Sequence, residues 1–118
     1  KTDKGKPYFP DAQETFFSIS HGGGYAAVAI GDSPCGIDIE TERPVSIRIR
    51  EKFLNNAPES EALVRWTERE SKGKLLGGGF FDTESGDPVS FRHLSFGNLT
   101  ITVCTPFGAE VSDTVETI

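Results

Sequence analysis

Three glycine-rich breaks divide this chain of 118 residues into segments with different patterns. Gly22-Gly23-Gly24 follows a short strand-like run, Gly77-Gly78-Gly79 ends a long charged segment, and Gly97-Asn98 is a dipeptide typical of two-residue β-hairpins. Glycine adopts the backbone conformations that tight turns and helix ends require. These breaks therefore predict where strands and helices stop, and they give the order strands, helices, strands.

Strand patterns lie on both sides of the central charged segment. Residues 25–30 are rich in Ala, Val and Ile, which predicts a buried strand. We expect residues 35–40 to turn back and pair with it, extending an antiparallel meander that begins with residues 16–21. Residues 89–94 and 99–104 are expected to form a second hairpin around Gly97-Asn98.

Two helices are expected between these strands. Residues 45–54 end with helical periodicity, and residues 58–76 place Ala62, Leu63 and Trp66 on one apolar stripe. The order of elements predicts an α+β fold, an antiparallel sheet with helices packed on one face. We divide the chain into an extended N-terminal arm at 1–15, a domain at 16–106 and a C-terminal tail at 107–118.

Composition limits the function. A net charge of -6 argues against non-specific nucleic-acid binding, and no apolar run is long enough for a membrane span. Cys35 and Cys104 lack metal-ligand spacing, which favours buried free thiols and a cytoplasmic location, with a disulfide between them as the alternative. The chain begins at Lys1 and has no methionine, so we expect residues upstream.

Gly36-Ile37-Asp38-Ile39-Glu40 is the sharpest local feature. Residues two apart in a strand share a face, so Asp38 and Glu40 project together while Ile37 and Ile39 face the core. Two adjacent carboxylates repel each other unless a positive group neutralises them, and Mg²⁺ prefers such oxygen ligands. An exposed acidic strand face is the alternative interpretation.

Two further segments carry candidate residues. Glu70 lies one helical turn after Trp66, and Lys74 follows one turn later on the same face, although an ordinary Glu-Lys surface pair has the same spacing. His21 ends a strand before three glycines, where phosphates could approach the backbone or where a turn simply needs a polar residue. Lys6 lies in a proline-stiffened segment and by itself is a solvated lysine.

The order of these motifs is more specific than any one of them. It runs Gly5-Lys6-Pro7-Tyr8, Phe17-Ser18-Ile19-Ser20-His21, Gly36-Ile37-Asp38-Ile39-Glu40 and Trp66-Thr67-Glu68-Arg69-Glu70-Ser71, closing at Lys74. This series resembles the Sfp-type 4'-phosphopantetheinyl transferases. The resemblance implies that Asp38, Glu40 and Glu70 bind magnesium, with Glu70 also a candidate for proton transfer. It implies that Lys6, Ser20, His21 and Lys74 contact the phosphates of coenzyme A.

The resemblance also implies a reaction: transfer of 4'-phosphopantetheine from coenzyme A to a serine of an acyl or peptidyl carrier protein, with Mg²⁺, or Mn²⁺, as the metal. Enzymes of this type have two similar halves. The motifs here are those of the second, metal-binding half, so we expect a phosphopantetheinyl transferase-like half-domain that is completed by an N-terminal half or by a homo-oligomer. Arg69 stands where the family has a lysine.

Other interpretations remain open at this stage. The basic residues Arg43, Arg48, Arg50 and Lys52 form either a docking surface for an acidic carrier or a solvated helix face. The chain could instead be a non-catalytic, truncated domain that binds coenzyme A or a carrier protein. A metal-dependent phosphohydrolase that uses the same acids is a third candidate.

Overall fold

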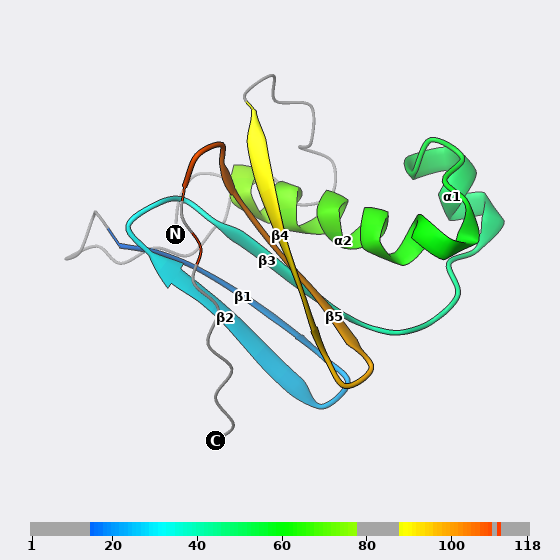
Figure 1. Cartoon of the computed structure of the whole chain (residues 1–118), viewed down its shortest axis with the longest axis horizontal. Coiled ribbons are helices and arrows are strands. Elements are labelled where there is room, and N and C mark those ends of the chain that lie inside the picture. Colours follow the sequence, from blue (N-terminus) through cyan, green and yellow to red (C-terminus); the bar gives the residue numbers. More distant parts are fainter. Residues whose placement is uncertain (1–14, 78–87, 110, 112–118) are drawn as a thin grey trace.

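The computed structural model describes residues 15–77, 88–109 and 111 (Figure 1). The α+β prediction is confirmed. Nearly all of the predicted N-terminal arm, Lys6 included, and most of the predicted tail lie outside the described residues. The elements are β1 (Phe16–Gly22), β2 (Tyr25–Gly31), β3 (Gly36–Thr41), α1 (Ile47–Phe53), α2 (Glu59–Leu76), β4 (Val89–Phe96) and β5 (Leu99–Pro106).

The strands form two hydrogen-bonded sheets. One contains β1 and β2, and the other has the order β3-β5-β4, with every pair antiparallel. The expected hairpin β4–β5 is present, and Gly97 at its turn has a φ of 58°. The expected meander is wrong at its last step, because β3 pairs with β5, far away in the sequence, and not with β2. Local turn signals at residues 31–34 carry no information about that distant partner.

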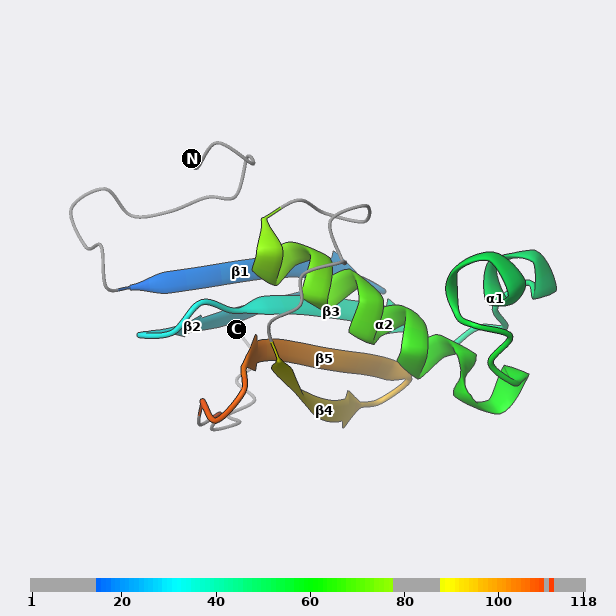
Figure 2. The same ribbon diagram turned by 90° about the horizontal axis from the view of Figure 1, so that it is seen from above.

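Serine side chains connect the two sheets where β1 lies beside β3 (Figure 2). The Ile37 N–H donates to Ser18 Oγ at 3.0 Å, and the Ile39 N–H donates to Ser20 Oγ at 3.1 Å. From the first hydrogen bond to the second, the residue number increases by two on β1 and by two on β3, so the two strands run parallel. We call this contact the β1–β3 joint: the hydroxyls accept hydrogen bonds that carbonyls accept in an ordinary ladder.

Helix α2 packs across β3 and β5 on one face of the three-stranded sheet (Figure 2). It can approach closely because Gly36 has no side chain: a Cβ there would overlap Ser71 O and lie 2.6 Å from Leu75 N. The helix ends where expected, at Gly77, whose φ of 77° is the left-handed conformation that favours glycine. Gly36 therefore sets the separation between β3 and α2.

Helix α1 lies beyond the end of the sheet, next to the start of α2 (Figure 2). Ser46 caps it by accepting a hydrogen bond from the Ile49 N–H at 3.3 Å. Buried Val45, Leu54 and Ala62 form the cluster between the two helices, and Leu63 and Trp66 pack against it as the predicted stripe required. This apolar contact orients α2 from its first turns.

Strand β2 is not the buried strand that its composition predicted. Val28 is 59% exposed and Ile30 is 67% exposed. The reason is tertiary: α2 covers β3 and β5, and within the described part of the chain no helix packs on β2. An apolar composition indicates that a strand tends to be buried, but it does not predict whether a helix or another sheet packs on that strand.

Cys35 and Cys104 are both buried free thiols, as the cysteine spacing favoured. Burial raises the pKa of Cys104 to about 12. Neither helix in the described ranges is long and apolar enough to cross a membrane.

Candidate metal and phosphate site

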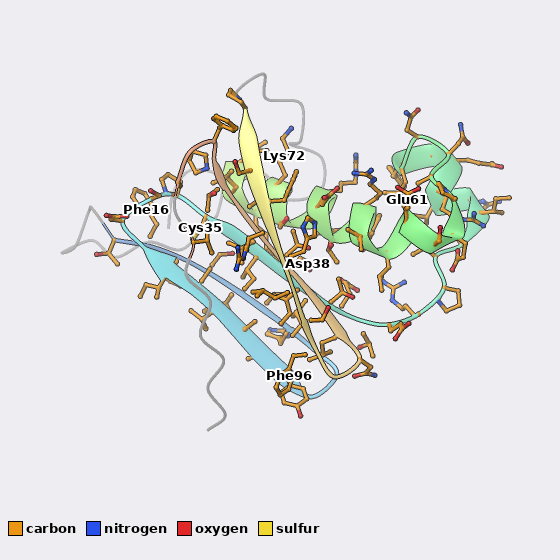
Figure 3. All side chains as sticks on the ribbon, viewed as in Figure 1. Phe16, Cys35, Asp38, Glu61, Lys72 and Phe96 are labelled. Carbon is orange, nitrogen blue, oxygen red and sulfur yellow. The ribbon has the colours of Figure 1, made fainter. Side chains whose placement is uncertain are left out.

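Asp38 lies in the middle of β3, an edge strand of the three-stranded sheet, on the side of the sheet where α2 packs (Figure 3). Its directly opposite partner on β5 is Thr102, and side chains of opposite residues lie on the same face. Thr102 Oγ1 is 2.7 Å from Thr67 Oγ1 of α2, which identifies that face as the one the helix covers. Asp38 consequently places its carboxyl group between strand and helix, and the residue is only 5% exposed.

The prediction that Ile37 and Ile39 face a core is confirmed, whereas the alternative of an exposed acidic strand face is wrong for Asp38. Ile37 and Ile39 are buried as expected, but Asp38 on the other face is buried as well, because α2 packs there. Glu40, closer to the strand end, is partly exposed and forms a 2.9 Å ion pair with Arg43. The two carboxylates therefore have different environments despite their shared face.

Helix α2 brings Lys74 and Glu70 to this pair of acids. The Lys74 ammonium lies 3.9 Å from Asp38 Oδ1 and donates to the carbonyl oxygens of Ile37 at 2.9 Å and Ile19 at 3.4 Å. Glu70 is partly buried, and burial together with the charge of Glu40 raises its pKa. The one-turn spacing of Glu70 and Lys74 thus places both at the acids of β3, and not in an isolated surface pair.

The carboxyl group of Asp38 has a strongly altered acidity. Burial, followed by the negative charge of Glu40, raises its pKa to about 8, whereas Lys74 acts in the opposite direction. The repulsion that the sequence predicted is therefore present, and one lysine offsets it only in part. A second positive charge would stabilise the ionised form of Asp38.

The chemistry of these side chains, rather than their present arrangement, suits a hard divalent cation, which prefers carboxylate oxygens. Asp38 Oδ2 is buried and accepts no hydrogen bond from the part of the chain that the structure describes, so a strong acceptor oxygen is left without a donor. Glu40 is near enough to Glu70 for its negative charge to raise the pKa of Glu70. Across the part of the chain that the structure describes, no three acidic, histidine or cysteine side chains are arranged so that they could hold a metal ion without moving. A cation here would draw the flexible Glu side chains toward Asp38.

Ser20 reaches the acids and His21 does not. Ser20 is buried in the β1–β3 joint and directs its hydroxyl to Asp38 Oδ1 at 3.5 Å. His21 is exposed and lies on the opposite face of β1, as the alternation of burial along the strand indicates. Ser20 and Lys74 therefore both approach Asp38 Oδ1, whereas His21 lies on the other face of β1, near the end of the strand.

Arg69 and the basic residues near α1 have structural contacts. The Arg69 guanidinium lies over the ring of Phe53, 5.1 Å from its centroid, so it helps to hold the two helices together. Of the four basic residues singled out in the sequence, Arg43 pairs with Glu40 and Arg50 with Glu59, the latter at 3.6 Å. Arg48 and Lys52 are exposed.

Sequence reasoning missed the structural role of Ser18 and the buried pair Thr67 and Thr102. A signal was present for Ser18: two serines at alternate positions of a strand that also carries Phe17 and Ile19 give that strand one small polar face. No comparable signal identified the threonine pair. Its members are 35 residues apart and meet only because α2 crosses β5.

Comparison with known proteins gives one consistent family. No family model matches the chain. Among curated proteins, 4'-phosphopantetheinyl transferase Sfp of Bacillus subtilis is 38% identical over 61 residues, which cover 52% of this chain and 27% of Sfp. The gsp transferase of Aneurinibacillus migulanus is 31% identical over 93 residues, covering 69% of this chain and 38% of the relative. Part of this chain is homologous to the 4'-phosphopantetheinyl transferases.

A more distant transferase extends the match. The 4'-phosphopantetheinyl transferase AcpT of Escherichia coli is 28% identical over an alignment of 127 positions, covering 88% of this chain and 64% of AcpT. The chain therefore spans less than two thirds of the length of each of these transferases. The α+β fold is consistent with a transferase half-domain.

Proposed function

We propose that this chain carries the metal- and phosphate-binding part of a 4'-phosphopantetheinyl transferase, and that it binds a divalent cation and coenzyme A. The observation that carries the proposal is the buried carboxyl group of Asp38, with one oxygen lacking a donor, to which α2 brings Glu70 and Lys74. Homology to the transferases over part of the chain supports the same reaction class.

Asp38, Glu40 and Glu70 would hold Mg²⁺, or Mn²⁺, through carboxylate oxygens. When bound, the cation would neutralise negative charge on the pyrophosphate of coenzyme A. The Lys74 ammonium lies 3.9 Å from Asp38 Oδ1, so a phosphate next to the cation would be within its reach. Ser20 would contribute its hydroxyl from β1, with His21 at the strand end and Lys6 as further phosphate contacts.

The proposed reaction is a phosphoryl transfer. The serine hydroxyl of a carrier protein attacks the phosphorus that bears the pantetheine arm, and a new O–P bond forms. The bond from that phosphorus to the bridging oxygen breaks, and 3',5'-ADP leaves. Glu70 is the candidate acceptor of the serine proton, because α2 brings its carboxyl group to the acids of β3, next to which the phosphates would lie.

The carrier-protein partner is proposed from charge. Acyl and peptidyl carriers are acidic, so they would dock near exposed Arg48 and Lys52 on α1. The neighbouring Arg43 and Arg50 are engaged by Glu40 and Glu59, which lowers their contribution to such a surface. We therefore propose that, of the four basic residues, only Arg48 and Lys52 contact the carrier protein.

The direct test incubates the chain with coenzyme A, Mg²⁺ and an apo carrier protein, and then weighs the carrier by mass spectrometry. We expect the added mass of phosphopantetheine on one serine, lost with EDTA and in Asp38→Ala. A carrier of unchanged mass in the presence of the parent chain would rule out transfer by this chain alone.

A binding measurement distinguishes a non-catalytic domain that still binds these ligands from an incorrect assignment of the ligand site. Calorimetry with Mn²⁺ and then with 3',5'-ADP should show both ligands bound to the parent chain and neither bound tightly to Asp38→Ala. Binding without transfer would support a non-catalytic domain, for which the partial coverage of the transferases gives a specific reason. Release of phosphate from a simple phosphate ester would instead favour the phosphohydrolase.

A further inference from the structure

The β1–β3 joint has an unusual construction that bears on the acids of the site. Between ordinary parallel strands, backbone N–H groups donate to backbone carbonyls. Here two N–H groups of β3, from Ile37 and Ile39, donate to the hydroxyls of Ser18 and Ser20 at 3.0 and 3.1 Å. The serines are 4% and 6% exposed, so water does not readily replace them.

A lysine of α2 donates hydrogen bonds to backbone carbonyl oxygens of both strands in the joint. The Lys74 ammonium donates to Ile37 O of β3 and to Ile19 O of β1, so one side chain binds both strands. Ser18, Ser20 and Lys74 therefore hold together two strands that share no backbone ladder. Each of these three side chains bonds directly to the backbone of β3.

Asp38 lies at the centre of this arrangement. Its neighbours Ile37 and Ile39 are the two residues whose N–H groups enter the joint, so the backbone on both sides of Asp38 is fixed by serine hydroxyls. Ser20 and Lys74 also approach the Asp38 carboxyl group itself, at 3.5 and 3.9 Å. The joint thus determines where Oδ2, the oxygen without a donor, is held.

We propose that Ser18 is a positioning residue of the metal site: it fixes the Ile37 N–H and thereby the orientation of the Asp38 carboxyl group toward a divalent cation. This inference rests on the proposed function. Ser18 separates positioning from direct contact, because its hydroxyl bonds to the backbone of Ile37, whereas Ser20 and Lys74 approach the Asp38 carboxyl group. Groups that orient a metal ligand commonly affect metal affinity although they never contact the metal.

The test measures Mn²⁺ affinity by calorimetry, without coenzyme A or carrier protein, in a graded series at Ser18. Ser18→Ala removes the acceptor for the Ile37 N–H and should weaken Mn²⁺ binding about tenfold. Ser18→Thr keeps the hydroxyl and should restore most of the affinity, and Ser18→Cys, a weak acceptor, should fall between them. Hydrogen exchange at the Ile37 amide should accelerate in the same order.

Ser46→Ala is the matched control for a general loss of stability. It removes a serine acceptor from a backbone N–H, that of Ile49, far from the acids. Mn²⁺ affinity should stay at the parent value in this variant. If the parent binds Mn²⁺ and the Ser18 series binds it equally well, the positioning role is overturned while the proposed function stands. If the parent binds no Mn²⁺, both are overturned.

Discussion

Gly36 of β3 lies so close to Ser71 of α2 that no side chain fits between the strand and the helix. This contact places the next turn of the helix, with Lys74, beside Asp38. The glycine is therefore a condition for the site, because any added volume would move the helix away from the acids.

Replacing Gly36 tests this dependence. Gly36→Ala introduces a Cβ that meets backbone atoms of Ser71 and Leu75, which cannot rotate aside. We expect a loss of unfolding free energy of about 1–3 kcal/mol from overpacking, measured by urea denaturation, together with weaker Mn²⁺ binding. Gly31→Ala is the control, since a Cβ there meets nothing within 4 Å. Equal stability of the two variants would contradict the close packing.

The raised pKa of Asp38 predicts how stability depends on pH in the absence of metal. A folded-state pKa of about 8 against an ordinary 3.8 stabilises the fold at low pH, and this stabilisation is lost as the pH rises through about 8. In EDTA, the parent should therefore melt at a lower temperature at alkaline than at mildly acidic pH. Asp38→Asn should reduce that difference in melting temperature. Glu70, whose pKa is also raised, should account for part of the pH dependence that remains.

Metal should reverse the pH effect in the parent only. Mg²⁺ binds the ionised carboxylate and so stabilises the folded chain at alkaline pH by mass action. Melting curves with Mg²⁺ and with EDTA should differ for the parent and coincide for Asp38→Asn. A Mg²⁺-dependent shift of the same size in the variant would place the cation elsewhere.

Lys74 and a cation compete for the same charge. Lys74→Met removes a positive group 3.9 Å from Asp38 Oδ1 together with its hydrogen bonds to Ile37 O and Ile19 O. We expect the loss of the competing charge to outweigh the loss of the two hydrogen bonds, so that Mn²⁺ alone binds more tightly. Binding of 3',5'-ADP in the presence of Mn²⁺ should become weaker, because a phosphate contact is lost. Lys72→Met, two residues earlier on the same helix, should change neither affinity. Parallel changes of both affinities in Lys74→Met would contradict this division of roles.

The threonine pair between α2 and β5 should respond asymmetrically to substitution. Thr67 Oγ1 donates to Val64 O at 2.7 Å, so in their shared contact Thr102 is the donor and Thr67 the acceptor. Thr67→Val leaves the buried Thr102 hydroxyl without its acceptor and should cost about 1–3 kcal/mol of unfolding free energy. Thr102→Val leaves Thr67 its bond to Val64 and should cost less.

A double-mutant cycle completes the threonine test. With both residues changed to valine, no unsatisfied hydroxyl remains, so the combined cost should be smaller than the sum of the two single costs. Urea denaturation of the four proteins measures the difference. Strict additivity would show that the two hydroxyls do not interact in solution.

Local geometry made much of the site predictable from the sequence. Asp38 and Glu40 share a face because strands have a period of two, and Glu70 and Lys74 lie one turn apart because helices have a period near 3.6. Gly77 and Gly97 end their elements because the backbone has a positive φ at both positions, a conformation that glycine adopts without strain. These relationships involve neighbours in the chain, so they can be derived before any packing is known.

Tertiary structure alone decided how those local pieces meet. The pairing of β3 with β5, the exposure of β2, the burial of Asp38 under α2 and the β1–β3 joint all depend on contacts between residues far apart in the sequence. Such contacts depend on the packing energy of the whole fold. Each residue contributes only a small part of that energy, so the contacts cannot be predicted from single residues. The sequence by itself placed Asp38 beside Glu40 on one strand face and Glu70 one turn before Lys74 on one helix face. The close approach of α2 at Gly36 decided that these two local pairs meet around one buried carboxyl group.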